Sequence, residues 1–359
     1  MKKVFLIWVK EGAVKLSEFL AQGLGAEVIV SYKKEWKGYA IPIVLRYLIQ
    51  GVDSYRKLKK IRPQIIFVQN PPITAVLLAY IYCFLNKETS YVIDTHTAGF
   101  LDSKWIFFHP LHRFLARKAL YNTAHNYKNL EIMRRWGITN SSVLQFYNPQ
   151  KDEILDEKIV LPERLERKIS LKLGSKIFMV NRFANDDAWK EVIETARIMP
   201  WALFFITGDS KKISDKFKKI FPANVILTGY LNHKEFIALM NRCDMVLALT
   251  KRQDTVLWSI REIMSLGKPF ITSDTEVLKH YFGEIAIFSN HNPKDLKKKI
   301  KEAWDKRFEI KGKIEMFLEK DAQRWQKDIK NIKNIIQNSH AGYGEKPEKI
   351  LSKTEGALK

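Results

Sequence analysis

Short apolar runs and stretches of helical periodicity alternate along most of the chain, and this rhythm limits the possible folds more than any other feature of the sequence. Strand–helix–strand order of this kind predicts parallel strands in one sheet, with helices covering its faces. The first half of the chain shows the pattern as expected strands at 4–9, 27–31, 64–68 and 90–93 and expected helices at 16–24, 43–58 and 74–85.

The same rhythm restarts after a polar segment at about residues 151–172, which contains Pro162. Two α/β domains are therefore expected, over residues 1–160 and 161–313, and 359 residues are enough for both. Asn232 can cap one of the helices in the second half. The expected strands there are 176–180, 202–207, 224–228, 245–250 and 270–272, and the expected helices are 188–197, 233–241 and 255–266.

The C-terminal part of the sequence is rich in lysine. Apolar residues three or four apart predict amphipathic helices over residues 314–337, which we expect to pack back toward the first domain. The apolar pattern fades after Asn338, so residues 338–359 are expected to form a disordered tail.

The net charge of +22 predicts an affinity for polyanions such as nucleic acid, anionic lipid or phosphorylated substrates. No motif of a nucleic-acid-binding module accompanies this charge, so nucleic acid is not the expected partner. The segment Trp105–Lys118 mixes aromatic residues with cations and predicts a patch that faces an anionic membrane. The alternative is a core helix with a basic outer face.

Two apolar segments bear on localisation. The run at residues 4–9 is too short for a signal peptide, and Ile73–Leu85 is too short to span a bilayer and predicts a buried helix. Cys83 and Cys243 lack the spacing of metal ligands and fit a reducing compartment. We therefore expect a cytoplasmic protein that can bind the inner face of the membrane peripherally.

Several common site motifs are missing from the sequence. No dinucleotide-binding glycine motif, P-loop or nucleophile elbow occurs. The pair Asp186-Asp187 is interpreted as the start of a helix rather than as a metal site. We therefore expect no metal and no cofactor beyond a donor substrate.

Ligands of open parallel sheets bind beyond the carboxyl ends of the strands. In the second half these positions offer glycines, hydroxyls, cations and carboxylates, a mixture that suits a nucleoside diphosphate. In the first half Asp94 and His96 follow a strand and are candidates for activating an acceptor hydroxyl. His109, His112 and His125 have no partner that the sequence identifies.

The stretch MVLALTKRQDTVLWSIREIMSLGKPFITSD is the most informative one. It resembles the nucleotide-binding domain of group 1, family 4-type glycosyltransferases of the GT-B fold. That family carries two acidic residues eight apart, followed by a Gly-Lys-Pro turn, and Asp254 and Glu262 match them. The resemblance implies that Glu262 holds the donor ribose and that Asp254, here Asp instead of Glu, lies near the donor sugar.

Two further segments of the second half carry the resemblance. ITGDS, followed by NVILTGYLNHKEFIALMNRCDMVLAL, is similar to the stretch that frames the base in that family. VNRFANDDAWKEVIETA is similar to the first strand–loop–helix of that domain, so that Arg182 matches a phosphate-binding arginine, whereas the usual lysine has no clear counterpart. In the first half, VQNPPITAVLLAY and VIDTHT more weakly resemble mannosyltransferases that build lipid-linked oligosaccharides. The expected donor-binding residues are Arg182, Gly208, Asp209, Tyr230, Leu231, Thr250, Arg252, Thr255 and Glu262, and the expected catalytic residues are Asp94, His96 and Asp254.

The resemblance implies an α/β protein of the GT-B fold, with two Rossmann-like domains whose parallel sheets face a central cleft. It implies metal-independent transfer of a sugar from a GDP- or UDP-sugar to a glycan or lipid-linked acceptor. The mechanism is either retaining, with the leaving phosphate assisting, or inverting, with Asp94 or His96 as the base. A non-catalytic sugar- or nucleotide-binding protein and a basic nucleic-acid-binding protein are the alternatives.

Overall fold

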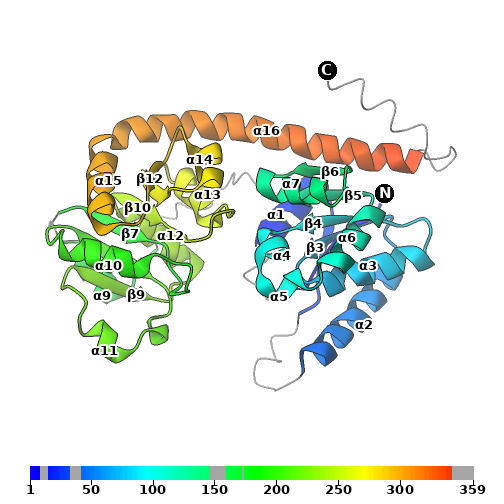
Figure 1. Ribbon diagram of the computed structural model, residues 1–359, viewed down its shortest axis with the longest axis horizontal. Helices are drawn as coiled ribbons and strands as arrows, with labels where there is room; N and C mark the ends of the chain where they lie inside the picture. The colour runs from blue at the N-terminus through cyan, green and yellow to red at the C-terminus, as the bar shows by residue number, and fades with distance from the viewer. Residues whose placement is uncertain (9–14, 33–41, 146–158, 172–173, 342–359) are drawn as a thin grey trace. The chain divides into compact units, whose positions relative to one another are not determined.

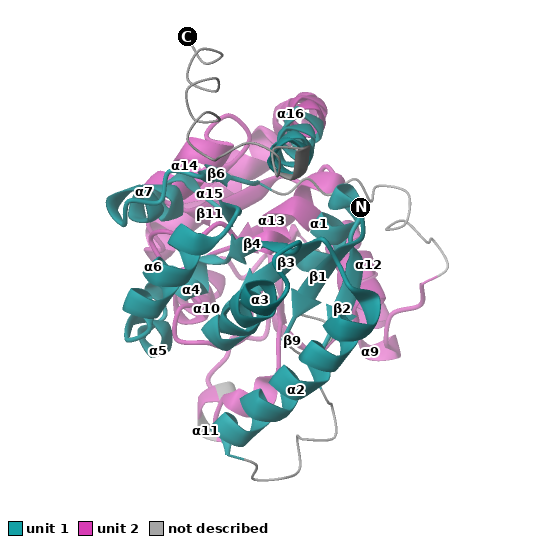
Figure 2. Cartoon of the chain, turned by 90° about the vertical axis from the view of Figure 1, so that its right-hand side faces the viewer, with its two compact units in different colours: residues 1–146, 324–359 teal, residues 147–323 magenta. Residues whose placement is uncertain are grey.

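The computed structural model describes residues 1–8, 15–32, 42–145, 159–171 and 174–341 (Figure 1). Contacts divide the chain into unit 1, residues 1–146 and 324–359, and unit 2, residues 147–323 (Figure 2). The sequence placed these boundaries at 160 and 313. The contacts place the first boundary at 146 instead of 160, and most of the segment between these two positions, residues 147–158, lies outside the described residues. Both divisions assign α9 (Glu163–Ile169) to the second unit, where Leu161 and Leu165 join the core.

Unit 1 contains a parallel six-stranded sheet in the order β2-β1-β3-β4-β5-β6. The expected strands and helices of this half are present, and β5 and β6 extend the sheet beyond them. The strands are β1 (Lys3–Ile7), β2 (Glu27–Val30), β3 (Ile65–Asn70), β4 (Ser90–Thr95), β5 (Tyr121–Ala124) and β6 (Ser141–Val143). The helices are α1 (Lys15–Leu24), α2 (Ile43–Ile61), α3 (Ile73–Leu85), α4 (Thr97–Leu101), α5 (Ser103–Ile106), α6 (His109–Lys118) and α7 (Tyr127–Arg135).

The central strand β3 shows why this half folds as a parallel sheet. All six of its residues are buried, as expected for a strand that helices cover on both faces. It pairs with β1 on one side and with β4 on the other, and the last pair of that register is Asn70 with Thr95. The carboxyl ends of β3 and β4 therefore lie side by side.

Helix α3 corrects one expectation. The run Ile73–Leu85 was expected to be a buried helix, and it is a helix, but only one face of it packs against the sheet. Ala75, Val76 and Ala79 are buried, whereas Phe84 and Leu85 are 59% and 60% exposed. The run is apolar all round, so its composition alone could not show which side meets solvent.

Unit 2 contains a second parallel six-stranded sheet in the order β12-β11-β10-β7-β8-β9. This order confirms the second Rossmann-like half. Its strands are β7 (Lys176–Met179), β8 (Leu203–Thr207), β9 (Val225–Gly229), β10 (Met245–Ala248), β11 (Phe270–Ser273) and β12 (Ile287–Ser289). Its helices include α10 (Trp189–Arg197), η2 (Ser210–Lys212), α11 (Asp215–Lys218), α12 (His233–Arg242), α13 (Trp258–Ser265), α14 (Glu276–Phe282) and α15 (Pro293–Asp305).

One long helix, α16 (Arg307–Ala341), ends the described chain (Figure 1). Its first part buries Ile310 and Ile314 in the core of unit 2. Its second part belongs to unit 1, where Trp325 stacks on Phe19 of α1 with ring centroids 5.0 Å apart.

The expected helical region at 314–337 is thus part of a single longer helix that extends in both directions. Residues 338–341, which were expected to belong to the disordered tail, are helical, and the rest of that tail lies outside the described residues. None of the helices in the described ranges has the length and apolar character that crossing a membrane requires.

Candidate functional site

The loop after β7 is fixed by its own aspartate. The Asp187 carboxylate accepts hydrogen bonds from the backbone amides of Arg182 and Ala184, at 2.9 Å and 3.0 Å. This corrects the expectation that Asp186-Asp187 begins a helix, because α10 begins at Trp189, after both aspartates. Asp187 instead stabilises the loop that presents Arg182.

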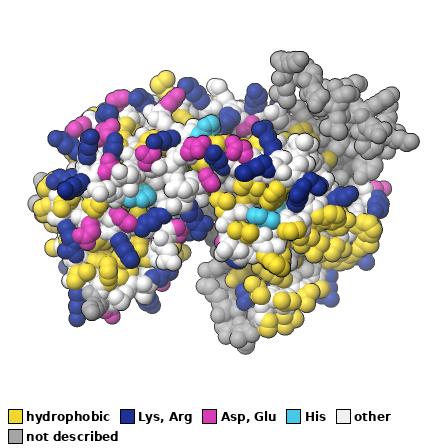
Figure 3. Space-filling model, viewed as in Figure 1, with side chains coloured by type: hydrophobic (Ala, Val, Ile, Leu, Met, Phe, Trp, Pro, Cys, Tyr) yellow, Lys and Arg dark blue, Asp and Glu magenta, His cyan; other side chains and the backbone are white. Residues whose placement is uncertain are grey.

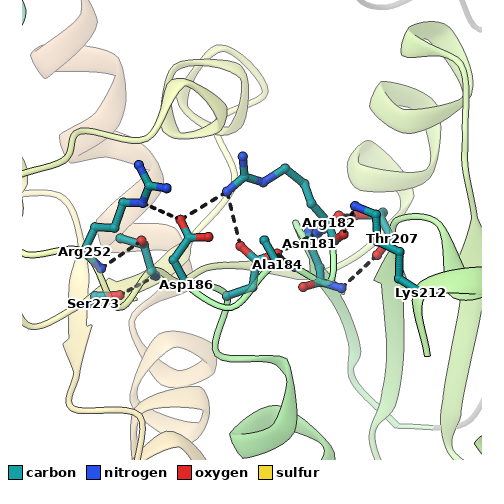
Figure 4. A network of polar contacts seen from close by, with 10 residues as sticks. Asn181, Arg182, Ala184, Asp186, Thr207, Lys212, Arg252 and Ser273 are labelled. Carbon is teal, nitrogen blue, oxygen red and sulfur yellow. Dashed lines mark hydrogen bonds and ion pairs between the residues drawn. The ribbon is translucent and has the colours of Figure 1, made fainter. Parts of the chain in front are cut away.

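Two arginines that the sequence predicted for donor binding converge on one carboxylate (Figure 4). Asp186 Oδ2 lies 3.3 Å from Arg182 Nη2 and 2.7 Å from Arg252 Nε. The side chains of Arg182 and Arg252 are 66% and 47% exposed, whereas the Asp186 side chain that they share is only 19% exposed. Arg252 follows β10 and Arg182 follows β7, so the sheet topology brings them together.

Lys212 supplies a third cation at this point. It lies in η2, and its Nζ donates to the carbonyl oxygen of Arg182 at 2.8 Å (Figure 4). The sequence left the family's phosphate-binding lysine without a counterpart. The sequence did not identify Lys212, because this residue lies in the turn after β8, thirty residues along the chain from Arg182.

Gly208 provides a close backbone approach beside these cations. Its φ is +110°, and a Cβ there would lie 2.8 Å from the Asn181 carbonyl oxygen, so only glycine fits without strain. Asp209, also predicted for donor binding, accepts from the backbone amide of Lys211 at 3.0 Å and caps η2. Its carboxylate therefore has a local structural role at the site edge.

Glu262 is buried on α13, with 7% of its surface exposed. Its Oε1 lies 2.9 Å from Nε2 of His233, the first residue of α12. The Asn232–Glu235 capping box holds the start of that helix, as the expected Asn232 cap requires. His233 follows Tyr230 and Leu231 directly, so the Glu262–His233 pair joins two segments that the sequence predicted separately.

A hydroxyl group connects the end of β11 to the residues that follow β10 by hydrogen bonds. Ser273 Oγ accepts from the Thr250 backbone amide at 2.7 Å and lies 2.7 Å from His291 Nε2. Thr250 Oγ1 in turn accepts from the Arg252 amide at 3.2 Å. Thr255 Oγ1 is buried and has no hydrogen-bond partner among the described residues, so it can bond to a ligand.

Asp254 lies in the loop ahead of α13. The helix was expected to begin at Thr255, but it begins at Trp258 with Leu257 as its N-cap residue. Asp254 and Glu262 are therefore not two turns apart on one helix. The acidic pair instead combines a partly exposed loop residue with a buried helical one.

In unit 1 the predicted residues Asp94 and His96 meet a third group, His125. Asp94 Oδ1 accepts from Thr123 Oγ1 at 2.7 Å and lies 3.0 Å from His125 Nε2. Asp94 Oδ2 lies 3.2 Å from His96 Nε2. Burial disfavours the charged carboxylate, but the neighbouring histidines outweigh it and hold the pKa of Asp94 well below its usual range.

The other histidines also have partners that the sequence did not reveal. His112 Nε2 lies 3.0 Å from Asn70 Nδ2, and burial lowers the pKa of this histidine to about 3. The ring of His109 lies 4.9 Å from that of Trp136. Each of these contacts joins segments far apart in the sequence, so spacing alone could not predict them.

The cluster of Asp94, His96 and His125 can hold a metal ion. Each residue offers one ligand atom, and the three atoms lie within 4.8 Å of one another. Asp94 Oδ2 and His96 Nε2 are buried without hydrogen-bond geometry to any described group. Imidazole nitrogen and carboxylate oxygen are ligands that Zn²⁺ accepts, so the expected metal independence needs a direct test.

Comparisons with known proteins agree with the fold. Residues 164–337 match the family model described as "Glycosyl transferases group 1", and no curated protein matches the sequence. Alr3699/HepE of Anabaena in complex with UDP-glucose is similar at 14% identity, with a TM-score of 0.69, over 95% of this chain and 100% of that one.

Two other solved structures are also similar. One, from E. coli, is described as trehalose-6-phosphate bound with UDP-2-fluoro glucose, and matches at 12% identity and a TM-score of 0.65 over 94% and 99% of the two chains. The UDP-GlcNAc 2-epimerase of Methanocaldococcus jannaschii matches at 16% identity and a TM-score of 0.55 over 84% and 92%. At such identities the likeness establishes the fold, and it extends to an epimerase.

The activity class therefore depends on the family match. The matched region, residues 164–337, contains Arg182, Gly208 and Glu262 together with the sheet that positions them. Residues 164–337 match the group 1 glycosyltransferase family, and the chain is a glycosyltransferase with the GT-B fold.

Proposed function

We propose that this enzyme transfers a sugar from a UDP- or GDP-sugar to a glycan or lipid-linked acceptor. The observation that carries the proposal is the convergence of Arg182 and Arg252 on Asp186, in the unit that also holds the Glu262–His233 pair. Cations at the carboxyl ends of parallel strands suit a diphosphate, and a buried carboxylate suits the ribose hydroxyls.

Asp186 is interpreted as an internal substitute for a phosphate. It accepts from both guanidinium groups and keeps them in place when no donor is bound. A diphosphate would compete with it for the same groups, and Lys212 lies beside them. Positive charge placed in advance stabilises the negative charge that develops on the leaving diphosphate.

Uracil is the base that the similar structures favour. Two of the structures compared above hold UDP-sugars, by their descriptions. This supports a UDP-sugar as the first donor to test, with a GDP-sugar as the second.

Asp94 and His96 are proposed to act on the acceptor. Asp94 holds His96 by an ion-pair contact of 3.2 Å, and the His96 side chain is partly open to solvent. If the reaction inverts the sugar, one of them takes the proton of the acceptor hydroxyl. If the reaction retains the configuration of the sugar, the leaving phosphate assists the acceptor, and Asp94 and His96 orient the acceptor.

Metal independence of donor binding is the first test. We expect UDP to bind in calorimetry with the same affinity in EDTA as in Mg²⁺, because Arg182, Arg252 and Lys212 supply the positive charge at the site. GDP serves as the comparison nucleotide. Loss of UDP binding in EDTA would show that a metal takes part.

Peripheral binding to the cytoplasmic face of the membrane is proposed for unit 1. The protein carries a net charge of +22, and Phe107 is 84% exposed within the patch Trp105–Lys118. Leu115 and Ala116 of the same patch are buried, so the segment combines the two alternatives weighed from the sequence.

Vesicle flotation tests this proposal. We expect binding to anionic vesicles that weakens as salt increases, because each cation close to an anionic surface contributes about 1 kcal/mol. Neutral vesicles of the same size are the control. Equal recovery with neutral and anionic vesicles would contradict an electrostatic membrane contact.

A further inference from the structure

An apolar groove opens on unit 1. It has a volume of about 870 Å³ and is lined by α2, α3, α5 and the residue after β1. Leu48 and Val52 of α2, Leu77 and Ile81 of α3, and Trp105 of α5 are among its lining residues. The volume lies in the range of small-molecule sites, which are concave and mostly apolar.

The lining of the groove includes a stripe of exposed aliphatic side chains. Val44, Leu48 and Val52 recur every four residues on α2, and they are 67%, 62% and 52% exposed. Figure 3 shows hydrophobic side chains gathered over the part of unit 1 that carries α2 and α3, with lysine and arginine around them. Large contiguous apolar patches are rare on the surface of soluble proteins, and those that occur commonly mark a binding site.

The charged groups that line the groove favour an anionic partner, although Lys104 also lies 3.4 Å from Asp102 Oδ2. Its charged lining residues, Arg56 and Lys104, are both cations, and none of the described lining residues is a carboxylate. Thr74 and Trp105 also line it, and Thr74 Oγ1 and Trp105 Nε1 are buried with no hydrogen-bond partner among the described residues. Two unsatisfied donors and two cations in the lining of one groove suit a phosphate group.

The groove also reaches the edge of the sheet where the acceptor is expected. Trp8 follows β1, and Thr74 lies in the first turn of α3, directly after β3. Strand β3 pairs with β4 up to Thr95, and His96 is the next residue. The groove therefore opens at the carboxyl ends of the strands, the end of the sheet that also carries Asp94 and His96.

We propose that the groove binds the hydrocarbon chain of a lipid-phosphate acceptor, with the phosphate at Thr74, Trp105 and the two cations. This inference rests on the proposed function, because it treats unit 1 as the acceptor-binding unit. It narrows the acceptor from a glycan or lipid-linked molecule to one that carries both an isoprenoid or acyl chain and a phosphate.

The test uses the full-length protein and farnesyl phosphate below its micelle concentration, with binding followed by tryptophan fluorescence. We expect saturable binding at one site, and at least tenfold weaker binding in Leu48→Glu, which places a charge in the groove. Leu85→Glu is the matched control, because Leu85 is a leucine of similar exposure, 60%, outside the groove lining. Thr74→Val should weaken farnesyl phosphate several-fold and leave farnesol unaffected.

Three results would overturn the inference. Equal affinities of Leu48→Glu and Leu85→Glu would remove the groove as the site. Binding only to vesicles, with no saturable binding of farnesyl phosphate, would show that the groove contacts the membrane. A change from dimer to monomer in Leu48→Glu, measured by ultracentrifugation, would show that the groove binds a second copy of the chain. UDP binding by calorimetry in the same variants reports separately on the proposed function, since Leu48 and Thr74 belong to unit 1.

Discussion

Replacing Glu262 by glutamine is expected to lower the affinity for UDP about 10- to 150-fold, corresponding to the roughly 1.5–3 kcal/mol of a charge-assisted hydrogen bond. Glu262 is 7% exposed, and its Oε1 lies 2.9 Å from His233 Nε2, so one oxygen is occupied and the other can accept from the ribose. Glutamine keeps the size of the side chain and removes its charge. Calorimetry with UDP measures the effect, and thermal melting checks the fold.

Two further variants make this result specific. Asp254→Asn should cost no more than Glu262→Gln, because Asp254 lies in the loop before α13 with a shorter side chain. Glu194→Gln changes an exposed carboxylate of α10 that pairs with Arg197, and it should bind UDP as the wild type does. A folded Glu262→Gln protein with unchanged UDP affinity would show that the ribose assignment is wrong.

Replacing Asp94 by asparagine is expected to reduce turnover by about 10²- to 10⁴-fold, the contribution typical of general acid–base catalysis. The carboxylate is buried, its pKa is held well below its usual range, and it contacts both His96 and His125. Asparagine keeps the shape but removes the charge that orients His96. The measurement is the initial rate of sugar transfer at saturating donor.

The affinity for UDP separates a catalytic effect from a general loss of structure. Asp94 lies in unit 1, whereas the nucleotide candidates lie in unit 2, so Asp94→Asn should bind UDP normally. His125→Asn tests whether the second histidine matters through Asp94 or through a metal, because added Zn²⁺ would restore only a metal-dependent activity. A folded Asp94→Asn enzyme with less than a tenfold loss of rate would exclude Asp94 and its contact with His96 from the proton transfer.

The buried strands were predictable because their composition carries the signal. Strand β3 is buried on both faces, so it reads as a continuous apolar run. Strand β5 has the sequence YNTA and β6 has SSV, which are too polar to stand out. Pairing with neighbouring strands, together with contacts such as the Asn122 amide donating to the Ala116 carbonyl, holds this edge in place.

The residues of the candidate site likewise fall into those that the sequence predicted and those that it did not. Arg182 and Glu262 were predicted because each belongs to a local pattern that the family shares. Asp186, Lys212 and His125 were missed because their roles depend on partners from distant strands. Such roles arise from the topology of the sheet, which brings together residues that no spacing relates.

The division of α16 between the two units has a consequence for synthesis on the ribosome. Trp325 and Ile329 are buried against α1, where a Cβ on Gly23 would lie 3.2 Å and 3.3 Å from them. Nascent unit 1 therefore lacks part of its own core until the second part of α16 has been synthesised, whereas unit 2 is continuous in the sequence from residue 147 to residue 323. Vectorial folding from the N-terminus, usual for chains with sequential domains, would reverse here, with the second unit completing its core before the first.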